Sequence, residues 1–231
     1  MLILCDFDGT ITEVDVTDLL WRRRIPAVER KRMVDEVNNG HWTMQKYMAH
    51  GYSFVPEAPS VLLNQLKSEV CIRDGWTDFL QVVQASSDQL QVVSNGLDFY
   101  IREFLPESTP ISSFIARFNG RYHVDLPRGC ALLPGEEFKV NRVRHLVADQ
   151  SLAQTIYIGD GRADFAPSLF CDTVFAVRDS RLARLRESYG LSAIEFDTFD
   201  TVTDFLLSAS SLRLHDGNSR RSADELTTWE P

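Results

Sequence analysis

Two aspartates separated by one residue follow a short apolar segment near the beginning of the chain. Asp6 and Asp8 belong to the string DFDGT, directly after the apolar residues 2–5. Side chains at positions i and i+2 of an extended chain lie on the same side, so both carboxylates can address one ligand. Their repulsion is costly unless a cation lies nearby, and Gly9 permits the tight turn that must follow. An acidic turn in which Thr10 caps a helix is the alternative, but the position after an apolar segment favours a functional pair.

A second acidic string, GDGRAD, follows residues 154–158. Asp160 lies where a strand is expected to end, and open parallel sheets place their sites at that edge. Asp164 comes four residues later, one helical turn on. With Asp6 and Asp8 these residues make four carboxylates that could converge, and hard oxygen ligands of this kind suit Mg²⁺. Taken alone, a helix N-cap at Asp160 or Asp164 is an equally good interpretation.

A hydroxyl group and a lysine could bind an anion at the same edge. Ser94, Asn95 and Gly96 follow residues 89–93, and a hydroxyl followed by backbone N–H groups at a helix start can cradle an anion. Ser-Asn-Gly is also an ordinary turn. Lys139 opens the helical pattern FKVNRVRHL, where the helix dipole disfavours a cation. A bound phosphate would explain that position, and a solvated surface lysine is the alternative.

The elements that position these residues alternate between short apolar runs and helical periodicity. Strands are expected at 2–5, 89–93, 154–158 and 172–177. Helices are expected at 76–86, 97–105, 138–149, 163–170, 180–188 and 199–208. The alternation is typical of parallel strands joined by crossover helices and predicts an α/β fold. The Asn-Gly pair within 114–126 predicts a β-hairpin.

Residues 14–71 differ from this pattern, because they show successive short helices without a strand signal between them. Inserted directly after the first strand, such a block would form a small helical cap over the strand ends. The α/β core would then comprise residues 1–13 and 72–211. The polar stretch 212–231 lacks periodicity, so we expect a disordered tail there.

Length and composition narrow the class of protein. The chain has 231 residues, 44% of them apolar, which is enough for one α/β core and a small accessory module. The net charge of −9 argues against a broad surface for nucleic acid or anionic membrane. The opening apolar run is too short for a signal peptide, and no apolar stretch approaches membrane-spanning length. The four cysteines show no metal-binding spacing. We expect a soluble, cytoplasmic protein, and the sequence defines no oligomeric state.

Taken together, the four strings resemble, in type and order, the four motifs of phosphatases of the haloacid dehalogenase superfamily. Those motifs are DxDGT, a Ser or Thr after the second strand, a Lys, and GDxxxD. The resemblance spans residues 1–180 and implies a Rossmann-like three-layer core with a parallel sheet. The helical insert resembles the C1 cap of the phosphoserine-phosphatase-like branch. The strings DFDGTITEVD and VSNGLDFYI are most similar to methionine-salvage phosphatases of that branch.

The resemblance implies a Mg²⁺-dependent phosphomonoesterase that acts on a small phosphorylated metabolite. Asp6 would be the nucleophile and would become an aspartyl-phosphate. Asp8 would protonate the leaving oxygen and then take a proton from the attacking water. The metal would be held by Asp6, the backbone carbonyl of Asp8, and Asp160, while Asp164 would support the metal-bound waters and Lys139.

The same resemblance implies a phosphate-binding set. Ser94, the N–H groups of Asn95 and Gly96, and Lys139 would balance charge on the phosphoryl oxygens. Asp15 lies where phosphoserine phosphatases place a Glu for the substrate amine. It could bind a substrate ammonium or hydroxyl group, or it could be the N-cap of a helix.

One departure from the branch's pattern concerns specificity. Ala163 stands where phosphoserine phosphatases have an Asn in GDGxND. Because an alanine supplies no oxygen to metal-bound water or substrate, this departure argues against strict phosphoserine specificity.

Three alternatives to a phosphatase remain open from the sequence. A phosphotransferase would use the same aspartyl-phosphate with an alcohol in place of water. A hydrolytic dehalogenase fits less well, since displacement at carbon needs neither Mg²⁺ nor Asp8. A non-catalytic binding protein could retain the fold, because fold does not fix function.

Overall fold

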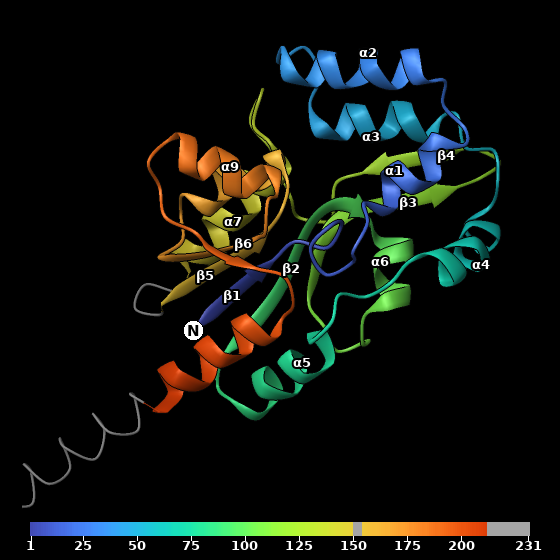
Figure 1. The fold of residues 1–231 in the computed structure, drawn as a ribbon. Coiled ribbons are helices and arrows are strands. Elements are labelled where there is room, and N and C mark those ends of the chain that lie inside the picture. The colour runs from blue at the N-terminus through green and yellow to red at the C-terminus, as the bar shows by residue number, and fades with distance from the viewer. Residues whose placement is uncertain (150–153, 212–231) are drawn as a thin grey trace, which may run out of the picture.

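A seven-stranded sheet forms the centre of the protein (Figure 1). The computed structural model describes residues 1–149 and 154–211, so the tail predicted at 212–231 lies outside the described residues. The strands follow the order β4-β3-β2-β1-β5-β6-β7, and only β4 runs antiparallel to its neighbour. Their bounds are β1 (Leu2–Cys5), β2 (Gln89–Leu97), β3 (Ile111–Phe118), β4 (Tyr122–Asp125), β5 (Thr155–Gly159), β6 (Thr173–Val177) and β7 (Ile194–Phe196).

Helices cover both faces of this sheet. The crossover helices are α5 (Trp76–Ala85), α6 (Asp98–Phe104), α7 (Phe138–Ala148), α8 (Phe165–Ser168, preceded by the 3-10 turn Arg162–Asp164) and α9 (Arg181–Ser188), and residues 200–211 are also helical. Side chains alternate along β1: Ile3 and Cys5 pack with α5, α6 and the helix at 200–211, whereas Leu2 and Leu4 pack with α7 and α9. This alternation produces the predicted three-layer α/β core.

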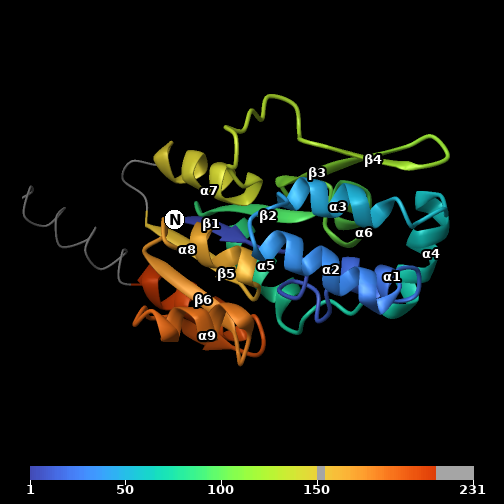
Figure 2. The ribbon, with the colours of Figure 1, turned by 90° about the horizontal axis from the view of Figure 1, so that it is seen from above.

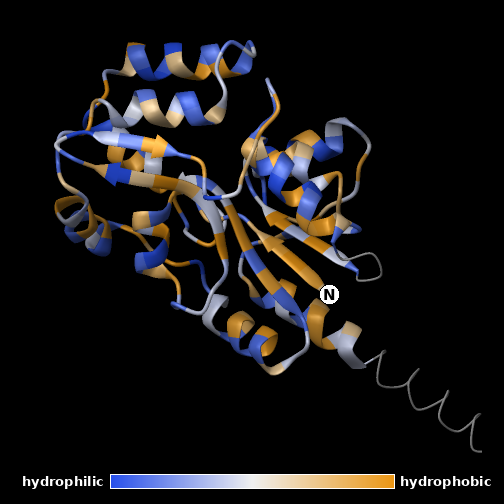
Figure 3. Ribbon diagram, turned by 180° about the vertical axis from the view of Figure 1, so that it is seen from behind, coloured by the Kyte–Doolittle hydropathy of each residue, from blue (hydrophilic) through white to orange (hydrophobic). Residues whose placement is uncertain are grey.

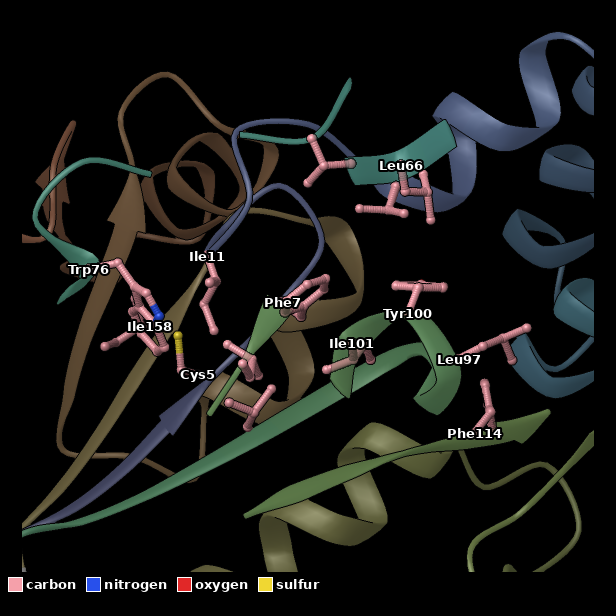
Figure 4. Packing of buried hydrophobic residues seen from close by; sticks show 14 of the residues in the cluster. Cys5, Phe7, Ile11, Leu66, Trp76, Leu97, Tyr100, Ile101, Phe114 and Ile158 are labelled. Atoms are coloured by element: carbon pink, nitrogen blue, oxygen red, sulfur yellow. The ribbon is translucent and has the colours of Figure 1, made fainter. Parts of the chain in front are cut away.

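Both faces of the sheet are strongly apolar. In Figure 3 the central strands are coloured mainly as hydrophobic, which is typical of parallel strands buried on two sides. Figure 4 shows the larger cluster, in which Cys5, Ile158 and Trp76 lie at one end, and Phe7 and Tyr100 lie nearer the carboxyl ends of the strands. The core therefore continues directly beneath the residues that follow β1.

The segment 14–71 contains the helices α1 (Val16–Arg22), α2 (Ala27–Asn38), α3 (Met44–Tyr52) and α4 (Pro59–Glu69). Figures 1 and 2 show them gathered at the end of the molecule toward which β1 and β2 point. An antiparallel bridge between Thr12 and Ile72 brings the two ends of this segment together. Helix α3 also packs against the β3–β4 hairpin, where the Gln45 side chain donates to the carbonyl of Val124 at 3.1 Å.

The hairpin expected within 114–126 is present, with its turn at Asn119-Gly120. The sequence did not reveal that β3 begins at Ile111 and also pairs in parallel with β2, nor that β7 forms the other edge. The helix expected over 163–170 is shorter, because the chain passes through the 3-10 turn before α8. Within the described residues, the helices are too short or too polar to cross a membrane.

Candidate active site

Three of the predicted site residues lie on neighbouring parallel strands: Asp6 and Asp160 directly follow β1 and β5, whereas Ser94 lies within β2, which continues to Leu97 and does not end at residue 93 as expected. Cys5, the last residue of β1, pairs with Val92 of β2 and with Ile158 of β5. The next residues along these strands lead to Asp6, Ser94 and Asp160. Because parallel strands end at one edge, the register alone brings these side chains together.

Carboxylate oxygens of Asp6, Asp160 and Asp164 lie within 4.8 Å of one another. The turn after β1 makes this approach possible. Gly9 adopts a φ of +77°, and a Cβ at this residue would lie 2.6 Å from a carboxylate oxygen of Asp160. The next residue, Thr10, donates its hydroxyl to Asp160 at 2.9 Å. Three oxygen donors at this spacing can hold a hard divalent cation.

Lys139 is buried beside these acids, with 2% of its surface exposed. Its Nζ lies 2.8 Å from Asp6 Oδ1 and 2.5 Å from Asp164 Oδ1. Burial alone would lower the pKa of Lys139, but the charges of Asp164 and Asp6 outweigh burial and raise it. The alternative of a solvated surface lysine is therefore wrong, and Lys139 is a fixed cation inside the site.

Asp164 is fully buried, and each of its oxygens accepts two hydrogen bonds. Lys139 Nζ and the Tyr157 hydroxyl, at 2.7 Å, donate to Oδ1. The backbone N–H groups of Asp160 (3.1 Å) and Gly161 (2.7 Å) donate to Oδ2. A carboxylate offers about four lone-pair sites, so all are occupied. Burial would raise the pKa of Asp164, but Lys139 and the other donors hold it below its usual range.

The Asp8 side chain accepts hydrogen bonds from residues outside the acidic cluster and lines the cavity described below. Its Oδ1 accepts the Val16 N–H at 3.1 Å, and its Oδ2 accepts the hydroxyls of Tyr100 at 2.9 Å and Ser94 at 3.3 Å. Burial, reinforced by the charge of Asp15, raises the pKa of Asp8 to about 8, although the hydrogen bonds from Tyr100 and Val16 act in the opposite direction. Asp8 can thus hold or release a proton near neutral pH.

Two acids of the cluster, Asp160 and Asp6, are less acidic than usual. Burial and the charge of Asp164 raise the pKa of Asp160 to about 7. Burial and the same charge raise the pKa of Asp6 well above its usual range, and Lys139 offsets this effect only in part. A cation bound between these carboxylates would favour their ionised forms.

The residues expected to bind phosphate lie at the edge of this cluster. Ser94 is buried and its Oγ accepts the N–H of Gly96 at 2.9 Å, so this N–H group is engaged within the chain. Asn95 and Gly96 both line the cavity described below. The Asn95 Oδ1 is buried and has no hydrogen-bond partner among the described residues. Ser94 contacts Asp8 and Lys139 contacts Asp6, so both side chains lie beside the acids and can donate to an anion.

A cavity of about 550 Å³ opens over these residues and is bounded on its far side by α2 and α3. The wall from these helices consists of Val34, Val37, Asn38, Met44, Tyr47 and Met48. Contacts between the two sides hold the wall in place: the Arg162 side chain donates to Asn38, and the N–H of Met44 donates to Glu137 at 3.2 Å. The cavity therefore has a charged floor and a largely apolar wall.

Asp15 lies on the cavity and also begins α1. Its Oδ1 accepts the N–H of Asp18 at 2.7 Å, so the alternative interpretation as a helix N-cap describes its observed contact. Contact between Asp15 and a substrate stays a prediction.

The chain matches the family model described as haloacid dehalogenase-like hydrolase over residues 3–166. This match covers well over half of the sequence. The chain belongs to this family.

Curated relatives of this haloacid dehalogenase-like hydrolase carry a phosphatase name. This chain is 28% identical over 212 residues to the 2-hydroxy-3-keto-5-methylthiopentenyl-1-phosphate phosphatase of an Exiguobacterium species. The alignment covers 88% of this chain and 96% of the relative. The protein of that name from Bacillus velezensis is 28% identical over 209 residues, with 87% of each covered.

A solved structure, the phospho-aspartyl intermediate analogue of phosphoserine phosphatase, aligns with a TM-score of 0.63 and 18% identity. It covers 88% of this chain and 97% of that one. These findings confirm the predicted family, fold and enzyme class.

The structure adds residues to the site of this hydrolase that the motifs did not indicate. Tyr100 and Tyr157 hold Asp8 and Asp164, and Arg73 donates to the backbone carbonyls of Gly9 and Thr10 at 2.8 and 2.7 Å. A tyrosine in an apolar pattern is ordinarily read as core, so its hydroxyl gave no signal. The position of Arg73 directly after the helical insert was the only hint that it could reach the first motif.

Proposed function

We propose that the protein is a Mg²⁺-dependent phosphomonoesterase for a small phosphorylated metabolite, with Asp6 as the nucleophile. The observation that carries this proposal is the convergence of Asp6, Asp160 and Lys139 at the floor of the cavity. A nucleophilic carboxylate needs a cation beside it when it approaches an anionic phosphoryl group. Lys139 supplies one positive charge, and the carboxylates of Asp6 and Asp160 can recruit another.

The donor set fits Mg²⁺. Asp6 and Asp160 offer carboxylate oxygens within reach of one ion, whereas Asp164 has its oxygens occupied by four donors. Asp6 and Asp160 would therefore hold the ion directly, together with the Asp8 carbonyl, and Asp164 would orient Lys139 and the backbone at 160–161. When bound, the ion would neutralise charge on the phosphoryl oxygens and on Asp6.

The reaction proceeds as two displacements at phosphorus. A carboxylate oxygen of Asp6 forms a bond to phosphorus, the ester P–O bond breaks, and the leaving oxygen takes its electron pair and a proton from Asp8. Water then attacks the aspartyl-phosphate, gives a proton to Asp8, and the bond between Asp6 and phosphorus breaks. The raised pKa of Asp8, about 8, suits both proton transfers near neutral pH. Ser94 and Lys139 bind the phosphoryl oxygens throughout.

Residues 14–71 act as the cap of this enzyme. Two contacts support this assignment: the Thr12–Ile72 bridge closes the segment at its base, and α2 and α3 supply the cavity wall. The core then comprises residues 1–13 and 72–211. A cavity of about 550 Å³ lies within the usual range for small-molecule sites, so a compact metabolite fits and a phosphoprotein does not.

The wall favours a substrate with an apolar portion next to its phosphate ester. Val34, Val37, Met44 and Met48 face the cavity and offer no charge. The substrate named for the curated relatives, 2-hydroxy-3-keto-5-methylthiopentenyl-1-phosphate, has a methylthio group that such a wall would accommodate. We therefore infer that this ester, rather than phosphoserine, is the leading candidate.

Two measurements test the proposal. Hydrolysis of para-nitrophenyl phosphate is compared with and without Mg²⁺, and between the wild type and Asp6→Asn. We expect activity only when both the metal and the intact Asp6 are present. Equal hydrolysis rates in the wild type and the mutant would show that Asp6 is not the nucleophile. In the second measurement, a panel of phosphorylated metabolites is tested with alcohol acceptors added. If more phosphorylated alcohol forms than free phosphate, the protein is a phosphotransferase instead.

A further inference from the structure

A buried tyrosine beneath the first motif contacts the residue that would transfer the proton. Tyr100 lies on α6 and is fully buried, with its ring 6.0 Å from that of Phe7 (Figure 4). Its hydroxyl lies 2.9 Å from Asp8 Oδ2 and 3.1 Å from Thr17 Oγ1. The contact thus connects α6, the turn after β1, and the first turn of α1.

The direction of these hydrogen bonds follows from the chemistry of the three groups. In the ionised form of Asp8 both oxygens can only accept, so Tyr100 donates its single proton to Oδ2; in the protonated form Oδ2 can still accept this hydrogen bond. The oxygen of Tyr100 then accepts the hydroxyl proton of Thr17. A phenol is protonated at neutral pH, so Tyr100 has a proton to donate.

A glycine is required for this arrangement. A Cβ at Gly96 would lie 2.1 Å from the Tyr100 hydroxyl and 2.5 Å from Asp8 Oδ2. The missing side chain at residue 96, near the end of β2, therefore leaves the space through which Tyr100 reaches Asp8. This close approach is a second reason for a glycine after Ser94 and Asn95, independent of phosphate binding.

Tyr100 makes the shortest of the three hydrogen bonds that orient Asp8. The Val16 N–H fixes Oδ1 at 3.1 Å, while Ser94 reaches Oδ2 only at 3.3 Å. Ser94 is also the group expected to turn toward a phosphoryl oxygen. When it does, Tyr100 is the remaining donor that holds Oδ2 in the described structure.

We propose that Tyr100 is a positioning residue for Asp8, and that Thr17 aligns the Tyr100 hydroxyl from the first helix of the cap. The proposal rests on the proposed function. Asp8 must present its proton to the ester oxygen as the P–O bond breaks and the electron pair moves to that oxygen. Without the Tyr100 hydroxyl, the Asp8 carboxyl can rotate, and the leaving oxygen is protonated less often in the correct geometry.

The test separates proton donation from other effects by changing the leaving group. The values of kcat/KM, which report the first displacement, are measured for Tyr100→Phe with n-butyl phosphate and with para-nitrophenyl phosphate. The nitrophenolate leaves without much help from an acid, whereas the alkoxide needs it. General acid catalysis is worth about 100-fold or more, so partial misplacement should cost about tenfold on butyl phosphate and less than about threefold on para-nitrophenyl phosphate.

Two further variants complete the experiment. Tyr122→Phe is the matched control, because the Tyr122 hydroxyl is also buried, has no hydrogen-bond partner among the described residues, and its ring stacks on Phe99. It should keep wild-type values on both esters. Thr17→Val should also lower kcat/KM more on butyl phosphate than on para-nitrophenyl phosphate. The loss should be smaller than in Tyr100→Phe, about threefold on butyl phosphate.

Equal losses on the two esters in Tyr100→Phe would overturn the proposal, as would no loss on either. If Tyr100→Phe does not fold, Thr17→Val decides: a preferential loss on butyl phosphate supports the proposal, and any other result overturns it. The proposed function is judged separately by the wild type and Asp6→Asn. Activity that needs Asp6 and Mg²⁺, combined with equal losses in Tyr100→Phe, would leave the phosphatase standing and remove only the positioning role.

Discussion

The floor and the wall of the cavity are built by different means. On the floor, three residues are held by several directed contacts: Asp164 accepts four hydrogen bonds, Asp8 accepts three, and Lys139 bridges two acids. On the wall, α2 and α3 present mainly apolar side chains. We infer from this contrast that preorganised polar contacts fix the chemistry, and we propose that selectivity depends on packing that can be exchanged without disturbing it.

The largest effect is expected on the floor, at the nucleophile. Asp6→Asn retains the shape of the side chain but removes the attacking oxygen anion. We expect kcat to fall by a factor on the order of 10⁴ or more with Mg²⁺ present, measured as phosphate release. The circular dichroism spectrum should be unchanged, and a fall of less than tenfold would show that Asp6 is not the nucleophile.

The second prediction concerns a residue of the floor that does not touch the substrate. Asp164→Asn weakens the hold on Lys139 and presents an amide to two backbone N–H groups, so kcat/KM should fall about 10- to 100-fold. Asp172→Asn is the matched control, because Asp172 accepts hydrogen bonds from Thr155 at the opposite end of β5. Similar losses in both variants would indicate general destabilisation instead.

On the wall, a charge should affect binding more than chemistry. Val37→Asp places a carboxylate next to the apolar part of the substrate, so KM for the best metabolite should rise about tenfold while kcat changes little. Val28→Asp provides the control on the same helix, since Val28 is 84% exposed and does not line the cavity. A fall in kcat without a rise in KM would contradict the separation of floor and wall.

The smallest effect is a dependence of Mg²⁺ binding on pH. The pKa of Asp160 is raised to about 7, so this carboxyl is mostly protonated below pH 7 and mostly ionised above it. Because a proton and the ion compete for the same oxygen, half-saturation should need about threefold more Mg²⁺ at pH 6.5 than at pH 7.5. Thermal shifts during metal titration measure this quantity, and tighter binding at the lower pH would refute the assignment.

Much of the floor could be predicted from the sequence because its residues follow apolar runs. Asp6, Ser94 and Asp160 each come after an apolar run, and parallel strands must bring such positions to one edge. The Lys139 side chain was predicted on resemblance, and its burial between two acids explains why it stands at a helix start.

Other features were hidden for physical reasons. The strand β3 carries Ser112 and Ser113, which break its apolar pattern, yet both are buried and Ser112 accepts a hydrogen bond from Arg142 at 2.8 Å. The contact of Tyr100 with Asp8 joins residues 92 positions apart and depends on the rotation of α6, which periodicity does not define. The three-residue strand β7 is too short to give a pattern.

The central claim, that Asp6 accepts the phosphoryl group, is tested most directly by the stereochemical course at phosphorus. The substrate is a phosphorothioate ester made chiral with oxygen isotopes and hydrolysed in isotopically labelled water with Mg²⁺. Each in-line displacement inverts the configuration, so two successive displacements through Asp6 predict overall retention. Inversion would show that water attacks the substrate directly and would contradict the account.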